Sequence, residues 1–242
     1  MSARALLVRG LAAGLVAGLV TFVVAYVVGG PQVEAAVSLE EAGAAGGEVS
    51  RGLQRTWGLL TATVLVGLAL GGSLGLVVAG TLGRLGRLLP GQSTALVTLL
   101  GFVSFALVPS LKYPATPPGV GHGGTIGDRT ALYFGFVLVS VLAAVLATRG
   151  ALRVRERVGT HAGVVAGVTG YLLVVVPAGQ VLGPAAEVGD FPADTLWSFR
   201  LASLVTLATL WGVIGLVLTG LVSRLYAAQT PQAARREPAA GL

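Results

Sequence analysis

Two groups of acidic residues are spaced in ways that can bind a divalent cation. Glu34, Ser38 and Glu41 follow one another at i, i+4 and i+7, so they share a face if residues 31–41 form a helix. Glu187 and Asp190 lie close together in a later polar segment. Carboxylate oxygens bind hard ions such as Mg²⁺ and, with an imidazole, borderline ions such as Co²⁺ or Ni²⁺. The alternative for the first group is an interfacial helix with a solvated acidic face.

A segment rich in proline and glycine, from Val108 to Phe134, contains the second set of chemically versatile side chains. Its prolines oppose a continuing helix, so we expect an irregular loop at the edge of the bilayer. His122 can bind a metal through a neutral imidazole, although a lone loop histidine is more often solvated. The candidate metal ligands are Glu34, Glu41, Glu187, Asp190 and His122. The residues predicted to shape this loop are Lys112, Tyr113, Pro114, Pro117, Pro118, Asp128 and Arg129.

Several kinds of chemistry find no support in the sequence. The chain has no cysteine, which excludes disulfides and thiolate metal sites. The glycines of the Val108 to Phe134 segment do not form the phosphate-binding pattern of an ATP site, and no nucleophile and base occur at a recognisable spacing. The apolar runs carry no central charged residue or histidine that would indicate a buried ion site or a proton relay. We therefore expect neither an enzyme nor a bound cofactor.

The elements that must position these residues are transmembrane helices. Of the 242 residues, 54% are hydrophobic and only 11% are charged, which is typical of an integral membrane protein. Six spans are predicted, at about 6–28, 59–82, 95–107, 131–147, 162–176 and 201–221. Pro109 and Pro177 shorten the third and fifth apolar runs, so five spans is the alternative count. A cleaved signal peptide is the alternative for the first span, but its apolar core is long for one.

The basic residues orient the six-helix bundle. With six spans, the more basic side of the membrane is cytoplasmic by the positive-inside rule, and both termini lie there. This side receives 11 of the 16 basic residues: Arg4, Arg9, Arg84, Arg87, Arg149, Arg153, Arg155, Arg157, Arg224, Arg235 and Arg236. Eight of the 10 acidic residues fall on the other side: Glu34, Glu40, Glu41, Glu48, Asp128, Glu187, Asp190 and Asp194. The outer loops are therefore the acidic surface.

Glycine patterns and the chain ends complete the domain organisation. Gly10, Gly14 and Gly18 recur every four residues in the first span, and Gly67, Gly71 and Gly75 do so in the second. Such stripes favour close helix packing, with a pore lining as the alternative. Their similarity leaves an inverted-repeat transporter as a further alternative. Residues 1–225 form the transmembrane domain and 226–242 a short polar cytoplasmic tail expected to be disordered. The arginines at 149–157 fit lipid head groups better than nucleic acid.

Several separated polar motifs resemble the CbtA family of proposed cobalt transporter subunits. They are EAAVSLEEA, SRGLQRTWGLLTAT, FALVPSLKYPATPPGVG, TIGDRTALYF and FPADTLWSFRLAS, which occur in this order over nearly the whole chain. The resemblance implies a multi-spanning permease subunit that supplies cobalt for cobalamin. It also implies a small partner, CbtB, with one helix and a histidine-rich segment. No ligand set is carried over from the family.

The combined hypothesis is an inner-membrane permease subunit that admits Co²⁺ from the outer face as its transported ion. The acidic outer loops meet the cation first, because Lys112 and Arg129 would repel it. The Val108 to Phe134 loop shapes the entry mouth, and it can enter the membrane only where protein covers its backbone. The bilayer and a CbtB-like subunit are the expected partners, and a homo-oligomer is compatible with the sequence. The alternatives are a non-transporting subunit that anchors a complex and a transporter of another ion or small solute.

Overall fold

The protein is almost entirely helical. A computed structural model describes residues 1–41, 51–118, 120, 126–183 and 188–234. Helices account for 88% of the structure, and no strand occurs in these ranges. Six of the described helices are long and apolar enough to cross a membrane: Ala3–Leu39, Gln54–Thr81, Pro90–Lys112, Ile126–Val158, Thr160–Val181 and Ala193–Thr230. The all-helical fold class and the count of six spans are confirmed, including the third and fifth spans, which favours six over the alternative count of five. The orientation of the termini stays a prediction.

The first three spans each combine α-helix with a π-helical turn. In chain order, the elements of these spans are α1 (Ala3–Val24), η1 (Ala25–Gly29), α2 (Gly30–Glu41), α3 (Arg51–Leu53), η2 (Gln54–Gly58), α4 (Leu59–Thr81), α5 (Pro90–Gly101), η3 (Phe102–Leu107) and α6 (Val108–Lys112). The last three spans are the uninterrupted helices α7 (Ile126–Val158), α8 (Thr160–Val181) and α9 (Ala193–Ala234). The expected tail begins inside α9, which remains helical to Ala234. Residues 235–242 lie outside the described part.

Two expectations about helix ends were wrong. Pro109 does not stop the third span, because helix continues through it to Lys112. The π-helical η3 precedes it, and the Val108 N–H bonds to the Val103 carbonyl, five residues back. This wider turn gives the proline ring room that a regular α-helix lacks. The basic segment around 149–157 is likewise helix rather than loop, since α7 runs to Val158 and only Gly159 separates it from α8. Gly159 has φ 112°, which a residue with a side chain rarely adopts.

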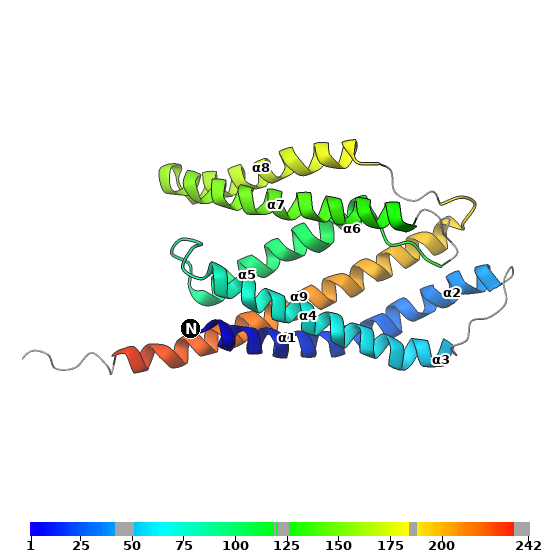
Figure 1. Cartoon of the computed structure of the whole chain (residues 1–242), viewed down its shortest axis with the longest axis horizontal. Helices are drawn as coiled ribbons and strands as arrows, with labels where there is room; N and C mark the ends of the chain where they lie inside the picture. The colour runs from blue at the N-terminus through cyan, green and yellow to red at the C-terminus, as the bar shows by residue number, and fades with distance from the viewer. Residues whose placement is uncertain (42–50, 119, 121–125, 184–187, 235–242) are drawn as a thin grey trace, which may run out of the picture. The chain divides into compact units, whose positions relative to one another are not determined.

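The structure divides into two compact units. Unit 1 comprises residues 1–22, 59–99 and 209–242, and unit 2 comprises residues 23–58 and 100–208. Within unit 1, α1 and α4 lie side by side (Figure 1), and the predicted glycine stripes form their contact. A Cβ added to Gly18 would lie 2.7 Å from the Thr63 carbonyl oxygen, and one added to Gly75 would lie 2.6 Å from that of Leu6. The packing interpretation of both stripes is thereby confirmed.

A second small-residue contact in unit 1 joins α5 to the later part of α9. A Cβ on Gly91 would overlap the Ser223 hydroxyl, and one on Gly215 would lie 3.0 Å from the Thr98 side chain. The Thr98 hydroxyl donates to the Thr94 carbonyl at 2.9 Å, four residues earlier in its own helix. Glycine opposite a hydroxyl-bearing residue therefore brings these helices close without leaving the Thr98 polar group exposed to lipid.

In unit 2, α7 and α8 run alongside each other (Figure 1). Phe136, Ala143 and Val175 form the buried centre of this interface. The Ser140 side chain is fully buried, and its hydroxyl shares a 2.7 Å hydrogen bond with the Tyr171 hydroxyl. Near the Gly159 turn, a Cβ on Gly163 would lie 2.7 Å from that of Arg155, so the absence of a side chain at Gly163 lets the two helices pack closely there. The ranges of unit 2 also include all of the predicted site residues.

Candidate functional site

The structure does not bring the predicted metal ligands together in its described part. His122 and Glu187 lie outside the described residues, and Glu41 ends α2 with a side chain that also lies outside them. Asp190 is exposed in the turn that precedes α9. Among the described residues, no group of three acidic or histidine side chains could hold a metal ion. The assignment of the five ligands therefore stays a prediction.

Glu34 has a partner that sequence reasoning missed. Arg55 forms a salt bridge with the Glu34 carboxylate across 21 positions of sequence. The guanidinium also lies over the Tyr26 ring, 4.8 Å from its centroid. A Cβ on Gly30 would come within 3.1 Å of an Arg55 nitrogen, so this glycine provides the space for the arginine. The available signal was the position of Arg55 in the sequence, at the start of the second predicted span and soon after the acidic segment that carries Glu34.

The Arg55 salt bridge changes what Glu34 can do. The Glu34 side chain is 60% exposed and that of Arg55 34%, so water reaches the pair and screens it. A cation that binds the Glu34 carboxylate has to compete with a guanidinium that is already in contact with it. Glu34 is therefore half of an exposed ion pair, whereas Asp190 is exposed and has no partner among the described residues.

The residues predicted to shape the outer loop lie in two helices and the turn between them. Lys112 is the last residue of α6, and Asp128 and Arg129 lie in the first turn of α7, so these three are helical rather than part of an irregular loop. The carboxylate of Asp128 suits that first turn, because helix N-termini favour negative charge. Between the two helices, only residues 113–118 and 120 are described. Pro117 is buried there, and Pro114 and Pro118 are half-buried.

Tyr113 anchors the end of the third span to α7 and to the segment after α8. Its hydroxyl donates to the Gly183 carbonyl at 3.1 Å, and its ring meets Phe136 edge to face at 6.0 Å. The Lys112 ammonium lies 5.4 Å from the centre of the Tyr113 ring. Burial raises the pKa of the Tyr113 phenol, which therefore stays a neutral donor at physiological pH. A cation beside an amphipathic ring at the end of a span is typical of an interfacial anchor, and the contacts of Lys112 and Tyr113 fit that role.

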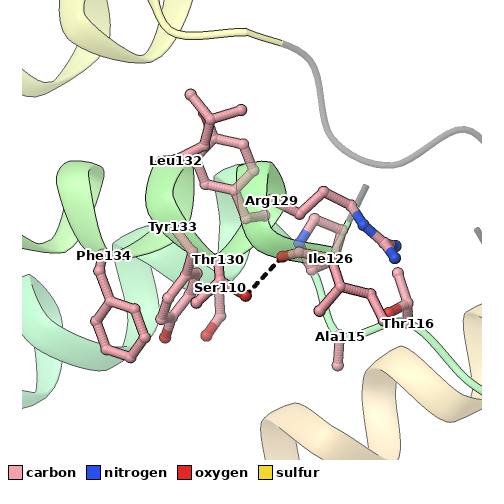
Figure 2. A pocket seen from close by; sticks show the side chains of 11 residues that line it. Ser110, Ala115, Thr116, Ile126, Arg129, Thr130, Leu132, Tyr133 and Phe134 are labelled. Atoms are coloured by element: carbon pink, nitrogen blue, oxygen red, sulfur yellow. Dashed lines mark hydrogen bonds between the residues drawn. The ribbon is translucent and has the colours of Figure 1, made fainter. Parts of the chain in front are cut away.

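A hollow of about 610 Å³ opens between the end of the third span and the start of α7 (Figure 2). It lies wholly within unit 2. Its lining residues are Ser110, Tyr113, Pro114, Ala115, Thr116, Ile126, Arg129, Thr130, Leu132, Tyr133 and Phe134. Three of the predicted loop-shaping residues, Tyr113, Pro114 and Arg129, line it, but no carboxylate does. This cavity is not a site for a bare cation, because its only charged side chain is a guanidinium.

The comparison with protein families supports the resemblance seen in the polar motifs. The family described as "Probable cobalt transporter subunit (CbtA)" matches residues 3–223. Searches of curated proteins and of solved structures found no match. The family match covers all six membrane-span-capable helices in the described part of the chain, apart from the last turns of α9. The chain therefore belongs to the CbtA family of transporter subunits and is a multi-pass membrane protein.

Proposed function

We propose that this protein is the permease subunit of a bacterial inner-membrane cobalt transporter. It admits Co²⁺ from the outer face and supplies the metal for cobalamin synthesis. The observation that carries the proposal is the family match over residues 3–223, which includes every polar outer segment as well as the spans. The six apolar helices supply the membrane-crossing part that a permease requires.

The charge distribution supports an orientation with both termini in the cytoplasm. The arginines at the α7–α8 turn and the termini belong to the basic side, which the positive-inside rule assigns to the cytoplasm. The segments that contain Glu34, Glu41, Glu187 and Asp190 then face outward. A negative outer surface attracts divalent cations and raises their concentration at the entrance.

We assign first contact with the cation to the predicted ligands of the outer segments. Among the described ligand candidates Asp190 is the best placed, because its side chain is exposed and has no partner among the described residues. Glu34 contributes only when Co²⁺ competes with Arg55 for the carboxylate. Carboxylates bind borderline divalent ions weakly and exchange them fast, which suits a transient entrance better than a storage site.

A small CbtB-like subunit with one helix and a histidine-rich segment completes the proposed transporter. The family description calls its members subunits, which implies a complex. This chain has only two histidines and no cysteine, so it is poor in the ligands that bind Co²⁺ tightly. A partner that carries imidazoles would supply that affinity.

Uptake of radioactive cobalt tests the proposal. Cells that express this chain with a CbtB-like partner should accumulate more Co²⁺ than empty-vector cells, and a panel of divalent ions in competition should define selectivity. Uptake equal to that of empty-vector cells, both with and without the partner, would reject transport.

The residue assignment has its own test in the same assay. Asp190→Ala and Glu41→Ala should lower uptake at limiting Co²⁺ and leave it nearly unchanged at saturating Co²⁺, because capture sets only the apparent affinity. Glu156→Ala is the matched control, since it removes an acidic residue from the basic side. Equal uptake by all three variants at limiting Co²⁺ would show that the outer carboxylates are scaffold.

A further inference from the structure

The hollow beside Arg129 has a polarity that changes with depth. Arg129 and Thr116 lie together at one end of it, and Phe134 lies at the other (Figure 2). Five residues of helix separate Arg129 from Phe134, which corresponds to about 7.5 Å along α7. Phe134 is 58% exposed, although it is large and apolar. The hollow is therefore charged toward the helix start and apolar farther along the span.

The polar wall of the hollow offers hydrogen-bond donors. The Thr130 hydroxyl is already used, since it donates to the Ile126 carbonyl at 2.7 Å (Figure 2). The Tyr113 hydroxyl is also already used, since it donates to the Gly183 carbonyl. The hydroxyls of Ser110, Thr116 and Tyr133 take no partner among the described residues. The Arg129 guanidinium already has another interaction, but it carries five N–H donors and can bind a second group. With the three hydroxyls it provides a donor-rich wall that suits an anion with several acceptor oxygens.

We propose that this hollow binds a phospholipid of the outer leaflet. The phosphate accepts hydrogen bonds from Arg129 and from the neighbouring hydroxyls, and an acyl chain lies along Leu132 and Phe134. The site is at the correct depth, because the third span ends at Lys112 and the fourth begins at Ile126. A volume of about 610 Å³ accommodates a head group with the first part of a chain. The proposal goes beyond the transport function, and only its assignment to the outer leaflet rests on the orientation proposed above.

Two features favour a lipid over a free phosphate ion. A small anion would occupy only the Arg129 end of the hollow and would leave its apolar end empty. The exposed Phe134 ring at that end borders the hydrocarbon region, where an acyl chain is the available occupant. An anionic head group adds attraction to the guanidinium, so phosphatidylglycerol should bind more tightly than phosphatidylcholine.

Native mass spectrometry of the full chain in detergent, titrated with phosphatidylglycerol, measures the binding. The wild-type protein should bind one lipid more tightly than the rest. Arg129→Gln should weaken that binding about tenfold, the usual effect of losing a charge-assisted hydrogen bond. Tyr133→Phe keeps the ring and should weaken binding about fivefold by the loss of one neutral hydrogen bond. Arg84→Gln is the matched control, because Arg84 is exposed in unit 1 and donates to the Gly80 carbonyl of its own segment.

Two results would overturn the proposal. If Arg129→Gln and Tyr133→Phe bind phosphatidylglycerol as Arg84→Gln does, the hollow is not the lipid site. If 10 mM inorganic phosphate, on the order of a saturating concentration for a weak anion site, displaces the first lipid, the hollow recognises free anions instead. Tyr133→Phe decides the matter even if Arg129→Gln does not fold, since it removes only a hydroxyl without a described partner.

Discussion

The α1–α4 contact and the α7–α8 contact hold two pairs of helices together in different ways. In the first, backbone lies against backbone, because glycines of both helices leave no side chain between them. In the second, Phe136 and Val175 fill the space and a hydroxyl pair crosses it between Ser140 and Tyr171. Lipid tails are as apolar as these side chains, so neither contact gains from the expulsion of water. Each depends on dispersion and hydrogen bonding, and their sensitivities to mutation should therefore differ.

The glycine contact should show the largest effect. Gly71→Ala places a Cβ 2.7 Å from the Gly14 Cα and against the Gly10 carbonyl, and backbone atoms cannot rotate away. We expect a loss of about 3 kcal/mol in the free energy of unfolding, the upper end of the range for overpacking. Titration with SDS in mixed micelles, followed by circular dichroism, measures it.

Gly80→Ala controls for the change in helix propensity. Gly80 lies in α4 as well, and nothing stands within 4 Å of a Cβ added there. This variant should be as stable as the wild type or slightly more stable, since alanine favours helix. The same loss in both variants would mean that the stripe does not hold α1 against α4.

Truncation at the centre of the α7–α8 contact should have a smaller effect. Phe136 is 2% exposed, and Phe136→Ala leaves a cavity in the interface. We expect a loss of about 2 kcal/mol, less than in a water-soluble core, because the unfolded reference state remains in an apolar solvent. Phe134→Ala removes the same ring two residues away, where it is 58% exposed, and should cost little. If the two truncations cost the same under SDS titration, Phe136 is not a packing centre.

The buried hydroxyl pair should give the smallest effect. Tyr171→Phe removes one side of the 2.7 Å hydrogen bond to Ser140. Such bonds between membrane helices contribute about 0.6 kcal/mol on average, so a loss of about 0.5–1 kcal/mol is expected. Tyr133→Phe, which breaks no described hydrogen bond, should leave stability unchanged. A double variant with Ser140→Ala that loses no more than Tyr171→Phe alone would confirm that the two hydroxyls act as a pair.

The difference between the two contacts also explains what the sequence could predict. A glycine every four residues has few other meanings in an apolar helix, so the α1–α4 contact was predictable from spacing alone. Phe136 and Val175 look like any other lipid-facing residue, since both sides of α7 and α8 are apolar. Which of them face a neighbour depends on helix rotation, and a sequence that is apolar all round does not encode that rotation.

The candidate site was predicted less well than the spans. Apolar length and composition were enough to locate six helices. The carboxylate face containing Glu34 was predicted from one helix alone, whereas the salt bridge to Arg55 depends on how a second helix packs against it. Likewise, Lys112 and Arg129 were assigned to one loop because of its prolines, yet each belongs to a helix. Contacts between residues that are far apart in the sequence depend on tertiary structure, which a local sequence pattern does not reveal.

The π-helical turn η3 also has a consequence for sequence length in this family. A π-helix accommodates one more residue per turn than an α-helix does, so η3 is equivalent to a single-residue insertion in the third span. A relative that lacks one residue between Phe102 and Leu107 would need no change in the position of either end of the helix. It would, however, face the clash between the Pro109 ring and a regular turn. Relatives should therefore have both the extra residue of η3 and the proline at position 109, or neither of them.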